Sequence, residues 1–175
     1  LSIEPNLLHA YFFLINTSYH SSKKLTREFY EAGIKLRPES FTLRWWYQGR
    51  LLPRWGGSYI ELDVIAENAR PYITHNPLLP ILSGRKHADM ANIQRRKGNH
   101  QEAIRHARTA MKYGKHSLYL RELAHAYYKI GDHPRARINY EAASVHLPFD
   151  RTILDRKAFL YYKNWDYQKC LDTIE

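Results

Sequence analysis

The chain has 175 residues, 44% of them hydrophobic, so it is long and apolar enough to bury a core, which argues against global disorder. A net charge of +10 makes it a basic protein and favours acidic partners: an acidic protein surface, a nucleic acid or an anionic membrane. The single cysteine, Cys170, excludes an intrachain disulfide framework and a cysteine-based zinc site. It suits a reducing compartment, and we expect a cytoplasmic protein with no membrane span.

The first part of the chain predicts helices and no strand, because no segment alternates polar and apolar residues. Leu25, Phe29, Ala32 and Leu36 are spaced four, three and four residues apart, as one buried helix face requires. Ser58 with Glu61 forms a capping box, which predicts a helix start. The four predicted helices cover residues 4–19, 23–37, 40–52 and 58–69.

Residues 76–175 predict six more helices. Asn76-Pro77 reads as a cap followed by a first-turn proline, and Asn99 with Glu102 forms a second capping box. The predicted helices cover 76–97, 99–114, 117–130 and 132–147, then one from 150 onward and one from 166 to 175. Because the chain starts at Leu1 rather than Met and stops inside the last predicted helix, we expect a longer native chain.

Two stretches of this second part repeat at a fixed spacing of 33 residues. Gly98-Asn99 recurs as Gly131-Asp132, Ala103 as Ala136, and Ala110 as Ala143. A third copy follows 34 residues later, with Trp165 in place of the turn glycine. A period of this length marks a solenoid of helical hairpins. Since only glycine enters the left-handed backbone region freely, the sequence does not determine the turn geometry at Trp165.

The repeated segment resembles the tetratricopeptide repeat (TPR). The clearest copy runs from Ser117 to Pro148, with Leu123 and Tyr127 on the first helix, the turn at Gly131, and Tyr140 on the second. The resemblance implies an all-α fold, a right-handed α-solenoid of antiparallel helical hairpins with about ten helices. We expect one helical-repeat domain over 1–175, in which 1–75 are divergent hairpins and 76–175 are TPR-like repeats, the last truncated.

A second resemblance lies in the Pro53-Arg54-Trp55-Gly56-Gly57-Ser58 segment. It looks like a Pro-Arg-Trp-Gly-Gly-Ser turn between helices in an uncharacterised bacterial family, which implies a bacterial source and no assigned activity. Two glycines before a helix N-terminus could hold an anion on free backbone donors, with Arg54 adding charge. The alternative is a tight structural turn with a capped helix. The segment Arg54, Trp55, Gly56, Gly57 and Ser58 is therefore a secondary site candidate.

No pattern of catalytic chemistry emerges. The sequence has no nucleophile-elbow motif and no phosphate-binding loop. Its ten histidines are scattered, and none form a His-Glu-x-x-His pair. We therefore expect no enzyme, no cofactor and no metal site.

The concave face of the repeats is the better candidate. In TPR proteins the first helix of each hairpin lines the groove, and the resemblance places ten residues there: Asn92, Arg95, Arg96, Arg121, His125, Tyr128, Lys129, Arg156, Tyr162 and Lys163. Arginine can clamp carboxylates and tyrosine adds apolar contact area, so this face suits an acidic peptide. The alternative is a solvated helix face.

These observations predict a protein–protein interaction scaffold that binds an acidic peptide or protein segment, in the role of a bacterial adaptor or toxin-immunity protein. The alternative is an RNA- or DNA-binding helical-repeat protein, which the charge permits. Two observations disfavour nucleic-acid binding: the basic residues are mixed with acidic ones, and no repeating base-reading pair is visible.

Overall fold

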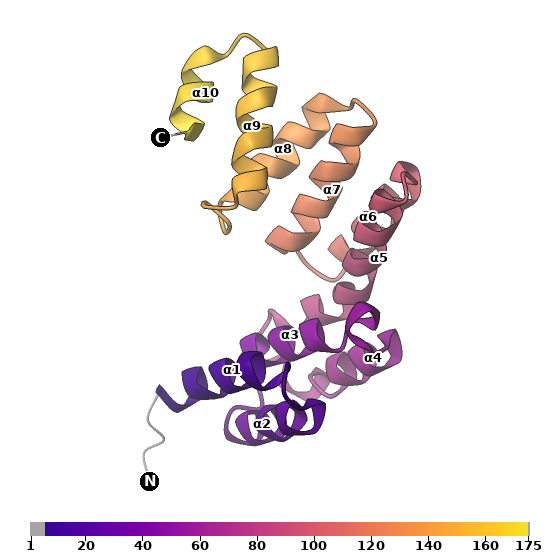
Figure 1. Ribbon diagram of the computed structural model, residues 1–175, viewed down its shortest axis with the longest axis vertical. Coiled ribbons are helices and arrows are strands. Elements are labelled where there is room, and N and C mark those ends of the chain that lie inside the picture. Colours follow the sequence, from indigo (N-terminus) through magenta and orange to yellow (C-terminus); the bar gives the residue numbers. More distant parts are fainter. Residues whose placement is uncertain (1–5, 175) are drawn as a thin grey trace. The chain divides into compact units, whose positions relative to one another are not determined.

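The computed structural model describes residues 6–174, and within that range it contains ten α-helices, three 3₁₀-helices and no strand (Figure 1). The α-helices are α1 (Asn6–Ser18), α2 (Lys23–Leu36), α3 (Phe41–Arg50), α4 (Tyr59–Glu67), α5 (Arg85–Arg96), α6 (His100–Met111), α7 (Ser117–Lys129), α8 (His133–Ser144), α9 (Arg151–Lys163) and α10 (Tyr167–Ile174). The 3₁₀-helices are η1 (Pro53–Trp55), η2 (Arg70–Tyr72) and η3 (Leu79–Gly84). The predicted all-α, TPR-like fold of helical hairpins is confirmed. The predicted helix edges at residues 4 and 175 lie outside the described residues.

The chain divides into two compact units, residues 1–86 and 87–175. The division falls after the predicted change of repeat type at residue 75. That both units act as one domain stays a prediction.

In the first unit, α1 packs against α2 and α3, and α3 packs against α4. Its core contains Ile15, Tyr30, Leu43, Tyr47 and Ile65. The predicted buried stripe of α2 is displaced, because the helix buries Tyr30 and Gly33 while 38% of Leu25 is exposed. Gly33 lies at a close contact: a Cβ there would lie 2.9 Å from Leu43 Cδ1 and 3.1 Å from Tyr11 Cβ, so a larger residue would require these side chains to move.

The predicted helix over 76–97 is two elements rather than one. Residues 79–84 form η3, with Pro80 at its first turn, and α5 begins only at Arg85. Proline lacks a backbone donor and clashes with the preceding turn, so a continuous α-helix through Pro80 is disfavoured.

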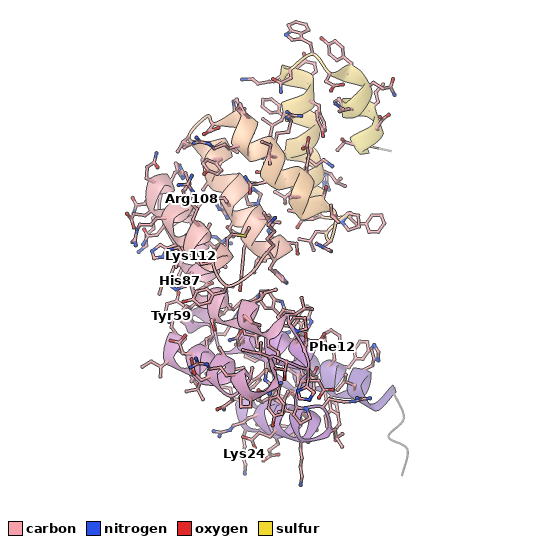
Figure 2. The ribbon with its side chains drawn as sticks, turned by 180° about the vertical axis from the view of Figure 1, so that it is seen from behind. Phe12, Lys24, Tyr59, His87, Arg108 and Lys112 are labelled. Atoms are coloured by element: carbon pink, nitrogen blue, oxygen red, sulfur yellow. The ribbon has the colours of Figure 1, made fainter. Side chains whose placement is uncertain are left out.

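In the second unit, α7 packs against α6 and α8, and α9 packs against α8 and α10. Small side chains fill the contacts between helices: Ala91, Ala103, Ala107, Ala136 and Ala143 are all fully buried. A hydrogen bond also joins α6 to α7: Nη2 of Arg108, a residue labelled in Figure 2, donates to the Tyr127 hydroxyl at 2.6 Å. Small residues at these positions allow the close helix crossings that the repeat predicts.

All three hairpins of the second unit turn in the same way. The amide N–H of Asn99, Asp132 and Asp166 donates to the carbonyl five residues before it, at 2.9, 3.0 and 3.1 Å. The preceding residue is left-handed each time, with φ of 84° at Gly98, 80° at Gly131 and 60° at Trp165. This is the Schellman helix ending, and it survives the loss of glycine at Trp165.

The two predicted capping boxes differ in outcome. Ser58 Oγ accepts from the Glu61 amide at 3.2 Å, so the cap of α4 is confirmed. The cap at Asn99 is wrong, because its side-chain amide donates instead to Gln94 Oε1 at 2.9 Å. The Schellman ending of α5 brings Asn99 back beside Gln94, which explains the exchange of partners.

Candidate binding groove

A cavity of about 300 Å³ opens on the first helices of the hairpins in the second unit. Eight of the ten predicted groove residues line it: Asn92, Arg95, Arg96, Arg121, His125, Tyr128, Lys129 and Arg156. Glu122, Tyr140 and Thr152 complete the lining, and the sequence analysis did not assign them to the groove. The lining of this cavity therefore contains five cationic side chains and one carboxylate, that of Glu122.

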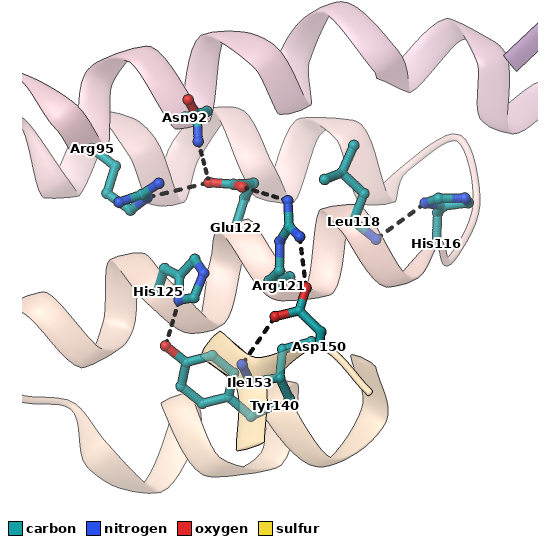
Figure 3. A network of polar contacts seen from close by, with 10 residues as sticks. All are labelled: Asn92, Arg95, His116, Leu118, Arg121, Glu122, His125, Tyr140, Asp150 and Ile153. Atoms are coloured by element: carbon teal, nitrogen blue, oxygen red, sulfur yellow. Dashed lines mark hydrogen bonds and ion pairs between the residues drawn. The ribbon is translucent and has the colours of Figure 1, made fainter. Parts of the chain in front are cut away.

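Glu122 is the centre of a polar network that Figure 3 shows. Only 3% of its side chain is exposed, and its Oε2 accepts from Asn92 Nδ2 and Arg95 Nε, both at 3.2 Å. Its Oε1 lies 3.5 Å from Arg121 Nη2. Because a buried carboxylate needs such partners, Arg95 and Arg121 neutralise Glu122 and are only partly available to another protein.

The spacing of α7 carried a signal for Glu122. Tyr119, Glu122 and Ala126 are three and four residues apart, and all three are buried. A carboxylate on the buried stripe of a helix requires a cation nearby, and Arg95 fills that need.

Arg121 also joins α7 to α9. Its Nη1 donates to Asp150 Oδ2 at 2.8 Å, while Asp150 Oδ1 accepts from the Ile153 amide at 3.2 Å and caps α9. Burial raises the pKa of Asp150, but the hydrogen bonds from Arg121 and Ile153 outweigh it and leave that pKa below its usual value. Arg121 thus holds two helices in register.

His125 contributes a hydrogen bond to the groove and no charge. Its Nδ1 lies 2.6 Å from the Tyr140 hydroxyl, inside the network of Figure 3. Burial lowers the pKa of His125 to about 4, so its imidazole is neutral at physiological pH. Burial also raises the pKa of Tyr140, which keeps its hydroxyl protonated.

The remaining cations of the groove, Arg96, Lys129 and Arg156, form no ion pair with Glu122. Arg156 donates to the Tyr128 hydroxyl at 3.0 Å and lies 4.6 Å from the centre of that ring. Arg96 and Lys129 are exposed, and neither forms an ion pair within the described part of the chain. Arg96 and Lys129 are therefore the cations best placed to meet an acidic ligand.

Tyr162 and Lys163 stand apart from this cavity. Tyr162 is 59% exposed and touches Tyr167 of α10 edge-on, with ring centres 6.0 Å apart. Lys163 Nζ lies 5.6 Å from the Phe159 ring centre. The structure brings these two predicted residues to the last hairpin, and not to the cavity that the other eight line.

The secondary candidate, residues 54–58, lies in the first unit. Gly56 is left-handed with φ of 77°, and a Cβ on Gly57 would lie 2.1 Å from the Leu51 carbonyl oxygen. Tyr19 and Lys23 fasten the loop, donating to the carbonyl oxygens of Trp55 and Gly56 at 3.2 and 3.1 Å. Each glycine thus has a structural reason, and anion binding at this loop stays a prediction.

Within residues 6–174, no group of three or more His, Cys, Asp or Glu side chains is placed to hold a metal ion. Over the same residues, no helix is both long enough and apolar enough to cross a lipid bilayer.

No protein-family model and no curated protein matches the chain. Among solved structures, the chain is similar to a thermophilic TPR protein of Thermus thermophilus. The two share 15% sequence identity, the match covers 95% of this chain and 87% of the other, and the TM-score is 0.46. The TPR-like fold therefore rests on the hairpins and turns described above. Membership of the bacterial family with the Pro-Arg-Trp-Gly-Gly-Ser turn stays a prediction.

Proposed function

We propose that the second unit binds an acidic segment of another protein in the groove on α5, α7 and α9. The observation that supports this most directly is the excess of positive charge in the cavity: five cations line it together with the single carboxylate of Glu122. Tyr128 adds aromatic contact area beside those cations, whereas Tyr140 is buried behind them. Such a lining suits a segment that carries carboxylates and apolar side chains.

The partner's carboxylates would meet Arg96 and Lys129 first. Both are exposed, and both lie at the C-terminal ends of their helices. Charge on the rim of a groove mainly raises the association rate and disfavours partners of like charge. Arg121 serves the architecture instead, because it already bridges Glu122 and Asp150.

The test is a selection from a random-peptide phage library with the full chain as bait. We expect the selected peptides to be enriched in Asp and Glu, and Arg96→Glu with Lys129→Glu to weaken their binding at least about tenfold in fluorescence anisotropy. The matched control is Arg105→Glu with Arg135→Glu, which changes the net charge equally on exposed side chains of α6 and α8. Peptides without acidic enrichment, or peptides that bind the groove variant as tightly as the wild type, would contradict the proposal.

An adaptor or toxin-immunity role would follow from such binding, and a bacterial source is part of that proposal. The alternative of RNA or DNA binding is tested with the same variants and a labelled single-stranded oligonucleotide. Binding that falls steeply with salt and depends on Arg96 and Lys129 would favour the nucleic acid over the peptide.

A further inference from the structure

A second cavity, of about 650 Å³, lies in the first unit and is independent of the groove. Helices α2 and α4 each pack against α3, and the cavity lies where residues of all three helices meet. Tyr30 and Ile34 of α2, Tyr47 of α3, and Ile60 and Val64 of α4 supply most of its apolar lining. This volume is within the roughly 300–1,000 Å³ range of small-molecule sites.

The apolar lining combines two exposed aliphatic side chains with a buried pair of stacked tyrosines. Ile60 is 76% exposed and Val64 51%, and they lie one turn apart on α4. Tyr30 and Tyr47 stack with ring centres 4.0 Å apart and planes 11° apart. An apolar ligand body would remove the two aliphatic side chains from water and rest against a preformed aromatic wall.

Arg44 adds a buried positive charge to the lining. Only 1% of Arg44 is exposed, and its guanidinium forms no ion pair with any residue from 6 to 174. Its Nη1 donates to the Ser40 carbonyl oxygen at 3.3 Å, while its Nε is buried without a hydrogen-bond partner. The Tyr72 ring centre lies 5.6 Å away. Because arginine keeps its proton even when buried, this charge is not removed by titration.

The carboxylates that line the cavity are committed elsewhere. Glu31 Oε1 lies 2.7 Å from Arg27 Nε, and Glu61 accepts from the Ser58 hydroxyl at 2.9 Å. A buried, unpaired cation in an apolar wall creates a positive potential that water screens weakly. The lining is therefore mainly apolar and carries an excess of positive charge, with Arg27, Lys35 and Arg44 against Glu31 and Glu61.

We propose that this cavity binds a small organic acid, with the carboxylate next to Arg44 and an apolar body against Ile60, Val64 and the tyrosine pair. The acceptor oxygens would supply the partner that Arg44 Nε lacks, and the charge of the ligand would offset that of the guanidinium. The site and the groove are on different units, so each can be tested without the other.

The test compares acids with alcohols of the same body: octanoate with 1-octanol, and biphenyl-4-carboxylate with biphenyl-4-methanol. Isothermal titration calorimetry on the full chain should show at least one acid binding about tenfold or more tightly than its alcohol. Arg44→Met keeps an unbranched side chain up to the position of Nε and removes the charge. We expect this variant to abolish the preference for the acid while the affinity for the alcohol stays unchanged.

A second variant tests the apolar wall without touching a buried residue. Ile60→Asn with Val64→Asn should weaken acid and alcohol alike at least about fivefold, whereas Ile138→Asn, on an exposed residue of α8, should change neither. Comparing the Ile60/Val64 variant with Ile138→Asn tests binding in the cavity even where Arg44→Met fails to fold. Equal affinity for acid and alcohol in the wild type, or full affinity in the Ile60/Val64 variant, would overturn the proposal.

Discussion

At the scale of single residues, His125 makes stability depend on pH. The folded protein binds its proton with a pKa of about 4, whereas an unfolded histidine binds it at about 6.5. Between those values the unfolded chain binds more protons, so stability is complete above about pH 6.5 and falls as the pH drops through this window. Comparing neutral pH with about pH 5, we expect a loss of about 2 kcal/mol in the free energy of unfolding.

Urea denaturation at the two pH values measures this loss. His125→Asn removes the titrating ring, and should flatten the pH dependence by that amount. A two-dimensional NMR titration of the His125 ring provides a direct reading. A midpoint near the unfolded value there would show that burial does not protect the imidazole.

Glu122 is the second residue with a predictable effect. Glu122→Gln leaves Arg95 without its counter-charge, whereas Arg121 keeps its ion pair with Asp150. The Arg95 side chain is 20% exposed, so water screens part of the cost. We expect a loss of about 1–3 kcal/mol in unfolding free energy, with tighter binding of acidic peptides because Arg95 is released.

The matched comparison for Glu122 is Glu102→Gln. Glu102 pairs with Arg105 on the exposed side of α6, where water screens the pair, so Glu102→Gln should cost less stability than Glu122→Gln. Equal stability losses in the two variants would mean that the buried network does not act as a unit.

At the scale of elements, the hairpin turn is the feature to test. Trp165 holds a left-handed backbone that costs a non-glycine residue about 1–2 kcal/mol. Its ring is 78% exposed and meets Tyr167 edge-on. Allowing for the greater freedom of glycine in the unfolded chain, Trp165→Gly should stabilise the protein by about 0.5–1 kcal/mol.

The control replaces glycine at the equivalent position of the preceding hairpin turn, Gly131. A Cβ on Gly131 would meet nothing within 4 Å, so Gly131→Ala introduces backbone strain alone and should destabilise by about 1 kcal/mol. Circular dichroism during urea unfolding measures both variants. A destabilised Trp165→Gly protein would mean that the indole contributes contacts worth more than the strain.

At the scale of the whole molecule, the sequence predicted the features that depend on local residue patterns, namely the helical hairpins and their turns. The 33-residue spacing predicted the hairpins, because each repeat needs the same small residues and the same turn. The start of α4 followed from its cap, whereas the cap at Asn99 and the single helix over 76–97 were wrong. It did not predict Glu122 as the counter-charge of the groove, because that role depends on Arg95, which lies in the preceding hairpin. Nor did it predict the cavity at Arg44, which exists only because α2 and α4 flank α3.

The exposed indole at the last hairpin turn has a practical use. Of the four tryptophans, Trp45, Trp46 and Trp55 belong to residues 1–86, and Trp165 alone belongs to residues 87–175. Tryptophan emission of a Trp165→Phe protein would report melting of the N-terminal unit only, while circular dichroism of the same protein would report the helices of both units. Comparing the two signals thus allows the melting of each half to be followed in one intact polypeptide.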